Sequence, residues 1–150
     1  MDILLVEDNA AEAKLTREAL REAGVQHQLF VVSDGEAATQ FLRNEAGYES
    51  VPRPNIVLLD LNLPRKRGIE VLADIKADPE LCSIPVIVIS NSQATEDIDD
   101  VYRFLGNGYI VKSGDLNEFF ATVKSMADFW MRRARLPSVS HVTVLPPPAP

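Results

Sequence analysis

The chain has 150 residues, 46% of them hydrophobic, and a net charge of −7; this fits one globular domain and argues against nucleic acid as a direct partner. A single cysteine, Cys82, excludes an internal disulfide, and we expect it to be a buried thiol in a reducing compartment. Because no apolar run approaches the length of a membrane span and no signal peptide precedes the first strand, we expect a cytoplasmic protein with no membrane partner.

Short apolar runs alternate with amphipathic segments along the whole chain. In chain order we expect a strand at residues 2–6, a helix at about 10–23, a strand at 27–32, a helix at 36–45, a strand at 56–59, a helix at about 69–77, a strand at 85–90, a helix at about 95–105, a strand at 109–112 and a helix at about 115–134. Asn9, Thr95 and Asp115 are the expected N-caps of three of these helices. The strand at 27–32 has mixed faces and is expected at an edge.

Strands that alternate with helices in this way predict an α/β fold with a doubly wound parallel sheet, (βα)5, and right-handed crossovers. We expect this domain over residues 1–135. Residues 136–150 end in a run of prolines that cannot form a core, so a proline-rich tail or arm is expected there. In open parallel sheets, ligands bind at the carboxyl ends of the strands.

Those carboxyl ends carry the candidate functional groups. Asp60 directly follows a strand expected to be buried on both faces, where an unpaired carboxylate costs on the order of several kcal/mol. Glu7 and Asp8 follow the first strand. Ser90 ends the fourth strand and Lys112 ends the fifth. We therefore expect three carboxylates, a hydroxyl and an ammonium to meet in one crevice.

Three neighbouring carboxylates call for a divalent cation, because two like charges about 4 Å apart repel by roughly 4 kcal/mol at an effective dielectric constant near 20. All-oxygen ligands favour Mg²⁺, with Mn²⁺ as a substitute. Lys112 needs an anion of its own. A phosphoryl group on Asp60 satisfies both cations, with one oxygen on the metal, one on Lys112 and one on the Ser90 hydroxyl.

The chain resembles the response-regulator receiver domains of two-component systems over roughly residues 1–135. The resemblance rests on Gly68, on Ser90 and on residues 4–9 (LLVEDN), 58–64 (LLDLNLP) and 109–112 (YIVK). A narrower resemblance is to stand-alone regulators that serve phytochrome-type histidine kinases; it rests on residues 52–55 (PRPN), 112–113 (KS), 129–130 (FW) and 136–137 (LP). The family fold is a flavodoxin-like sheet in the strand order 2-1-3-4-5.

The resemblance implies that Asp60 is the phosphoacceptor, loaded from the phosphohistidine of a sensor kinase. It further implies that Mg²⁺ is held by Asp8, Asp60 and the backbone carbonyl of Asn62, with Glu7 reaching the ion through water. Such a protein signals through a conformational or dimerisation change and is not an enzyme acting on outside substrates.

The resemblance also assigns roles to three residues around the acyl phosphate. Lys112 pairs with it, and Ser90 and Tyr109 form a switch pair in which the ring follows the hydroxyl inward. Two positions depart from the usual pattern. Arg67 stands where an acid usually precedes the glycine, which bears on kinase docking, and Ser113 replaces the usual proline after the lysine.

The last predicted helix indicates a partner surface. Its 20 residues span about 30 Å, whereas a strand of six residues spans about 20 Å, so its final turns should overrun the sheet. Apolar residues at 116, 119, 120, 123, 126, 127 and 130 have the spacing of a core stripe on this helix. Phe129, Trp130 and Met131 lie in the final turns, and Phe129 lies off that stripe. We expect a homodimer through this helix and the C-terminal arm.

Three other functions would leave different marks in the sequence. A phosphohydrolase with an aspartate nucleophile needs a second acid two residues on, where this chain has Asn62, and no cap domain is present. A degenerate receiver that only binds partners would lack the acid pair or the lysine. A flavin mononucleotide protein would need a phosphate loop after the first strand, where Glu7 and Asp8 repel phosphate.

Overall fold

The computed structural model describes residues 1–112, 114–138 and 148. Its elements in chain order are β1 (Asp2–Val6), α1 (Ala10–Glu22), β2 (Gln28–Val32), α2 (Gly35–Leu42), β3 (Ile56–Leu59), α3 (Gly68–Ala77), β4 (Val86–Ser90), α4 (Thr95–Arg103), β5 (Gly108–Val111), α5 (Leu116–Ala127) and the π-helical segment η1 (Asp128–Arg133). Each predicted strand and helix is present, and all but the last helix lie within a few residues of their expected bounds. Ser113 and most of the expected tail lie outside the described residues.

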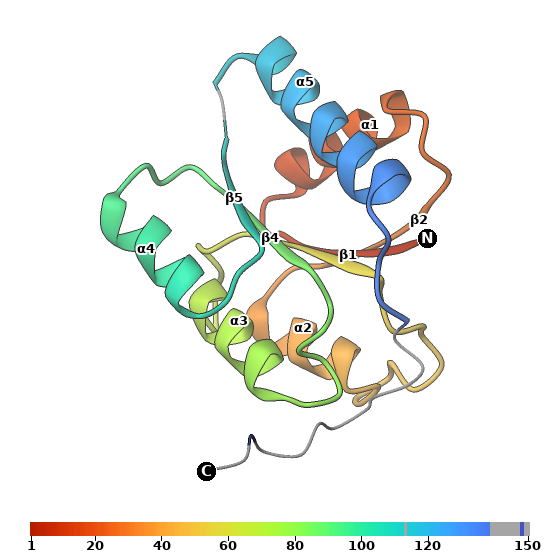
Figure 1. Ribbon diagram of the computed structural model, residues 1–150, viewed down its shortest axis with the longest axis vertical. Helices are drawn as coiled ribbons and strands as arrows, with labels where there is room; N and C mark the ends of the chain where they lie inside the picture. The colour runs from red at the N-terminus through yellow and green to blue at the C-terminus, as the bar shows by residue number, and fades with distance from the viewer. Residues whose placement is uncertain (113, 139–147, 149–150) are drawn as a thin grey trace.

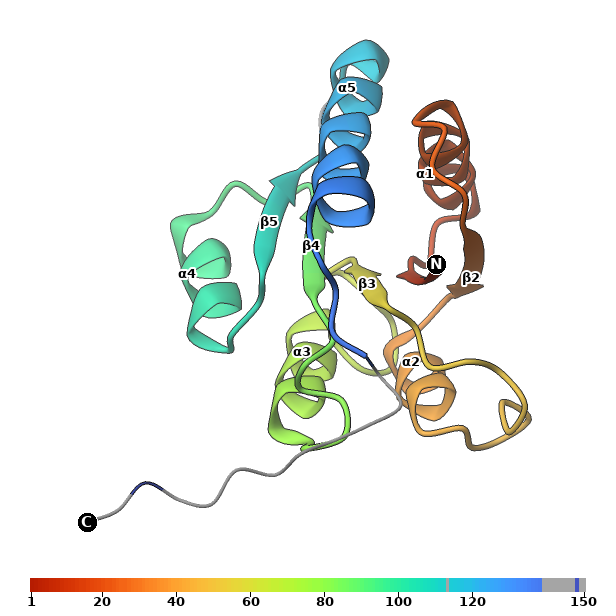
Figure 2. The same cartoon turned by 45° about the vertical axis from the view of Figure 1, so that its right-hand side comes forward.

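The sheet is parallel throughout, with the strand order β2-β1-β3-β4-β5, so the predicted fold class and order are confirmed. β2 lies at an edge, as its mixed faces predicted. Helices α1 and α5 cover one face of the sheet and α2, α3 and α4 cover the other (Figures 1 and 2). Burial on both faces explains why the central strands are continuously apolar.

Successive strand residues point to opposite faces, and this alternation builds two cores. The core beneath α2, α3 and α4 takes one set of strand side chains: Leu4, Val6, Val57, Leu59, Val86 and Val88. The core beneath α1 and α5 takes the alternate set: Ile3, Leu5, Ile56, Leu58, Ile87 and Ile89. Packing on both sides holds the strand ends in fixed positions, which the site requires.

Two of the three predicted N-caps are confirmed. Asn9 accepts a hydrogen bond from the Glu12 amide at 3.0 Å, and Asp115 caps α5 through two backbone amides. The third was wrong, because Thr95 is the first residue of α4 rather than its cap. Ser92 organises that turn instead: its hydroxyl donates to Asp97 at 2.5 Å and accepts from the backbone amide of residue 94 at 3.2 Å.

The last helix departs from the single α-helix that was expected at about 115–134. After Ala127 it widens into the π-helical segment η1, which ends at Arg133. Arg132 then donates to the carbonyl of Ala23 at 3.1 Å, where α1 ends. Leu116, the first residue of the predicted core stripe, is 53% exposed, so the stripe was wrong at this position. No helix in the described part of the chain has the length and apolar character needed to cross a membrane.

The connection between α3 and β4 corrects the expectation for Cys82, whose thiol is exposed. Leu81 and Ile84 fill the core there, and Cys82 faces outward. The ammonium of Lys76 ties this connection to the rest of the domain. It donates to the carbonyls of Cys82 and Ile84 at 3.0 and 2.9 Å, and to the side-chain oxygen of Asn107 at 3.0 Å.

We predict that Lys76→Met lowers the free energy of unfolding by about 1–2 kcal/mol, because three acceptors lose their donor. Urea denaturation measures this change, and Lys14→Met, at an exposed position on α1, serves as the control. Equal unfolding midpoints for the two variants would contradict the prediction.

Candidate functional site

The sheet hydrogen-bond ladder extends one residue beyond three strands and positions the site. The amide of Glu7 donates to the carbonyl of Val32 at 3.0 Å, and that of Asp60 donates to Val6 at 3.0 Å. The amide of Lys112 donates to the carbonyl of Ser90 at 2.8 Å. The backbone of each of these residues, just after the end of its own strand, is therefore fixed by a hydrogen bond to the neighbouring strand.

The side chains of those residues meet at the ammonium of Lys112. Its Nζ lies 2.7 Å from Oε1 of Glu7 and 2.9 Å from Oδ2 of Asp60. The Lys112 side chain is only 9% exposed, and Glu7 and Asp60 are also buried. The structure thus brings together the groups that the sequence placed at the ends of β1, β3 and β5.

A third carboxylate, which the sequence did not predict at this site, also contacts the ammonium of Lys112. Oε2 of Glu12, in the first turn of α1, lies 2.7 Å from Nζ. A glutamate three residues after an N-cap usually turns back to the cap, as in a capping box. The sequence therefore carried a signal for Glu12, but it indicated helix capping rather than contact with a lysine 100 residues away.

Burial and close like charges perturb the ionisation of this cluster. Desolvation, together with the neighbouring Asp60, raises the pKa of Glu7 to about 8. Burial alone would lower the pKa of Lys112, but its hydrogen bonds to Glu12, Glu7 and Asp60 raise that pKa above its ordinary value. The hydrogen bond from Lys112 lowers the pKa of Glu12. The lysine is therefore a fixed positive charge among acids.

The three predicted acidic ligands have a geometry that fits a divalent cation. Glu7, Asp8 and Asp60 each offer a carboxylate oxygen, and these oxygens lie within 4.8 Å of one another. Asp8 is exposed, so the cluster opens to solvent. The backbone of Asn62 is adjacent, because its amide donates to Oδ1 of Asp60 at 2.9 Å. Hard oxygen donors with one side open to water suit an ion such as Mg²⁺ or Mn²⁺.

The two predicted switch residues form hydrogen bonds with Ser92 and not with Asp60. Ser90 is fully buried at the end of β4, and its hydroxyl accepts from the Ser92 amide at 3.2 Å. The Tyr109 hydroxyl donates to the Ser92 carbonyl at 2.8 Å. Both therefore contact the loop that leads into α4.

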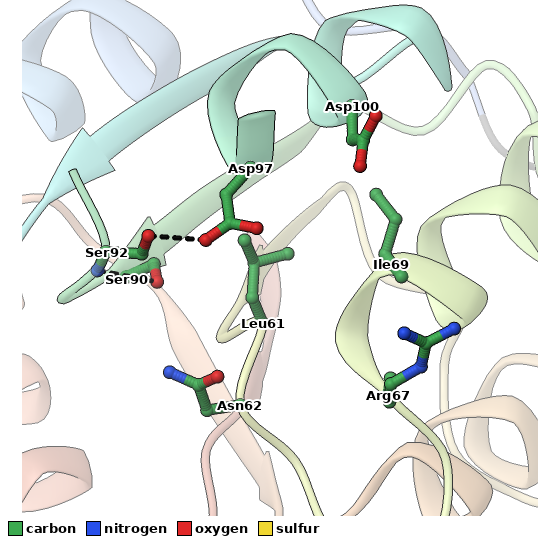
Figure 3. Close-up of a pocket in the computed structure, with 8 residues that line it drawn as sticks. All are labelled: Leu61, Asn62, Arg67, Ile69, Ser90, Ser92, Asp97 and Asp100. Atoms are coloured by element: carbon green, nitrogen blue, oxygen red, sulfur yellow. Dashed lines mark hydrogen bonds between the residues drawn. The ribbon is translucent and has the colours of Figure 1, made fainter. Parts of the chain in front are cut away.

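A cavity of about 160 Å³ lies beside this loop, between β3 and α4. Asn62 and Ser90 line one side of it, and Arg67 and Asp100 lie on the other (Figure 3). Arg67, which replaces the usual acid, is exposed and donates to Glu70 at 2.9 Å. Leu61 and Asn62, which directly follow Asp60 in the chain, also line this cavity.

Gly68 keeps the loop after β3 close to Asp60. A Cβ at this position would lie 2.3 Å from the backbone carbonyl oxygen of Asp60, well inside van der Waals contact. The Gly68 amide also donates to the carbonyl of Leu61 at 3.0 Å. Glycine at this position is therefore required by packing against the site.

Comparisons with known proteins agree with this geometry. The family described as "Response regulator receiver domain" matches residues 3–124. The response regulator Rcp1 of Synechocystis sp. is 43% identical over 136 residues, which cover 91% of this chain and 92% of the relative. The crystal structure of the phosphorylated cyanobacterial phytochrome response regulator RcpA has a TM-score of 0.88 at 47% identity, covering 91% of this chain and 98% of that one. The Mn²⁺-bound form of Rcp1 has a TM-score of 0.87 at 43% identity, covering 91% and 99%.

We predict that Glu7 makes the stability of the metal-free protein depend on pH. Its folded pKa of about 8 lies above the ordinary value of 4.5, so its contribution to stability is fully present below pH 4.5 and is lost as the pH rises through 8. Glu7→Gln carries no charge at any pH, and its free energy of unfolding should gain about 1–3 kcal/mol over wild type between pH 5.5 and 8.5.

Urea unfolding in EDTA at both pH values measures this difference, with Glu22→Gln, exposed on α1, as the control. Parallel pH profiles for wild type and Glu7→Gln would refute the prediction.

Proposed function

Because this chain belongs to the response regulator receiver family, we propose that its Asp60 accepts a phosphoryl group from the phosphohistidine of a sensor histidine kinase. The observation that carries the proposal is the 2.9 Å contact between the buried Asp60 carboxylate and the Lys112 ammonium, beside a three-acid cluster. RcpA, nearly half identical, is a phytochrome response regulator, and a phytochrome is therefore the proposed kinase.

The proposed chemistry is in-line transfer. A carboxylate oxygen of Asp60 forms a bond to phosphorus as the phosphorus–nitrogen bond of the phosphohistidine breaks, and the imidazole leaves with the electron pair and takes up a proton. Lys112 holds one oxygen of the transferred group. Its fixed positive charge and low exposure support this role, because a charge-assisted hydrogen bond is strongest away from water.

Glu7, Asp8, Asp60 and the backbone carbonyl of Asn62 are the proposed ligands of Mg²⁺, with Glu7 acting through water. When bound, the ion neutralises charge on the phosphoryl oxygens. The Mn²⁺-bound form of Rcp1 and the spacing of the carboxylate oxygens support a divalent ion at this position.

Ser90 and Tyr109 are the proposed switch pair. Their shared partner Ser92 supports this assignment, because a Ser90 hydroxyl that turns toward a phosphoryl oxygen gives up its bond to the Ser92 amide. The loop into α4 is then free to move, and the Tyr109 ring with it.

Residues 1–135 are the proposed receiver, and 136–150 the proposed arm, of a cytoplasmic phosphoacceptor that does not act on external substrates. The phosphohydrolase alternative is not favoured. The residue two positions after Asp60 is Asn62, which cannot donate a proton as a general acid.

We predict that wild type takes up a phosphoryl group from acetyl phosphate with Mg²⁺ and that Asp60→Asn does not, because an amide is no nucleophile here. Gel separation of the phosphorylated form and titration with beryllofluoride both measure this difference. A response in both proteins, or in neither, would count against the proposal.

A homodimer through α5, η1 and the arm is also proposed. Phe129 is 55% exposed and packs edge-on against Trp130, with ring centroids 5.4 Å apart. A large exposed aromatic ring supports a partner surface on this segment.

We predict that wild type sediments at twice its 16.6 kDa mass at high micromolar concentration and that Phe129→Glu does not. Tyr102→Glu, a similarly exposed aromatic position on α4, is the control and should remain dimeric. A monomeric wild type would rule out the dimer.

A further inference from the structure

The ammonium of Lys112 has no N–H group to spare. An ammonium carries three N–H donors, and three carboxylates lie within hydrogen-bond distance of this one: Glu7 at 2.7 Å, Glu12 at 2.7 Å and Asp60 at 2.9 Å. A phosphoryl group on Asp60 brings new oxygens that need the same donors. The N–H that now contacts Asp60 passes to the phosphoryl group itself, and any second N–H for that group must come from Glu7 or Glu12.

Exposure distinguishes the three partners. The Asp60 side chain is 7% exposed, and its phosphoryl group keeps the contact with the lysine. The Glu7 side chain is 3% exposed, so losing the hydrogen bond from the lysine would leave a buried polar group without that partner. The Glu12 side chain is 35% exposed. It is the one carboxylate of the three that water can solvate after release.

The surroundings of Glu12 allow that release. Glu12 and Lys112 both line a cavity of about 230 Å³ between α1 and the start of α5, which also includes Thr16 and Leu116. This volume accommodates water around a carboxylate that has left the lysine.

We infer that Glu12 is the carboxylate that phosphorylation displaces from Lys112, and that it competes with the phosphoryl group for this lysine. The inference rests on the proposed role of Asp60 as phosphoacceptor. Glu12 is then a positioning residue: it holds the lysine toward α1 in the unphosphorylated protein. Its release also frees the first turn of α1 from β5, which connects the state of Asp60 to the α1 face.

The inference is tested by the affinity for beryllofluoride at saturating Mg²⁺, measured by isothermal titration calorimetry. Glu12→Gln keeps the size of the side chain but removes its charge, and it should bind beryllofluoride about two- to fivefold more tightly than wild type, the range expected for an ion pair partly open to water. Glu12→Ala should change the affinity in the same direction. Glu22→Gln, on the same helix but at its far end, should match wild type.

The direction of the change separates competition from a structural role, because damage to the site weakens binding. Unchanged or weaker binding by both Glu12 variants, with normal binding by wild type, would overturn the inference alone. Absence of binding by wild type would overturn the proposed function, and the inference with it.

Discussion

Like charges can be buried at the edge of a sheet only with a counter-charge among them, and here Lys112 supplies it. Its ammonium contacts carboxylates that come from β1, β3 and α1, which are separate segments of the chain. Without a cation at this point, desolvation and mutual repulsion would protonate the acids or open the site. The raised pKa of Glu7 indicates that one positive charge only partly balances them. The same imbalance suits the site to a divalent ion.

The backbone of the parallel sheet sets the distances among these groups. Glu7, Asp60 and Lys112 each follow a strand directly and remain hydrogen-bonded to the strand beside it. Two cores, one on each face, prevent the strands from sliding. The side chains consequently extend from fixed points, so the backbone sets the distances among Glu7, Asp60 and Lys112 before any ligand binds.

Two sets of contacts lead away from the site in different directions. Ser92 connects Ser90 and Tyr109 with Asp97 at the start of α4, on one face of the sheet. Glu12 connects Lys112 with α1, on the other face. A change at Asp60 therefore has a physical route to each helical layer. The α1 route passes through an ion pair, whereas the α4 route passes through neutral and charge-assisted hydrogen bonds.

Much of the site could be predicted from the sequence because it depends on strand ends. Apolar runs identify strands, parallel strands share one edge at their carboxyl ends, and Glu7, Asp60 and Lys112 immediately follow such runs. The strand order came from the family resemblance. Local signals also placed the caps at Asn9 and Asp115, since a cap depends on a few neighbouring residues.

Tertiary structure decided what depends on packing between distant segments. Glu12 reaches Lys112 only because α1 packs beside α5 on one face of the sheet, and its local pattern alone indicated helix capping (Figure 2). The outward position of Cys82 and the π-helical turn after Ala127 likewise follow from packing, as Leu81 fills the core and Arg132 reaches the end of α1. Hydrophobic periodicity indicates which apolar residues share the buried face of an element. The partner of a charged side chain depends instead on how separate elements are placed in space.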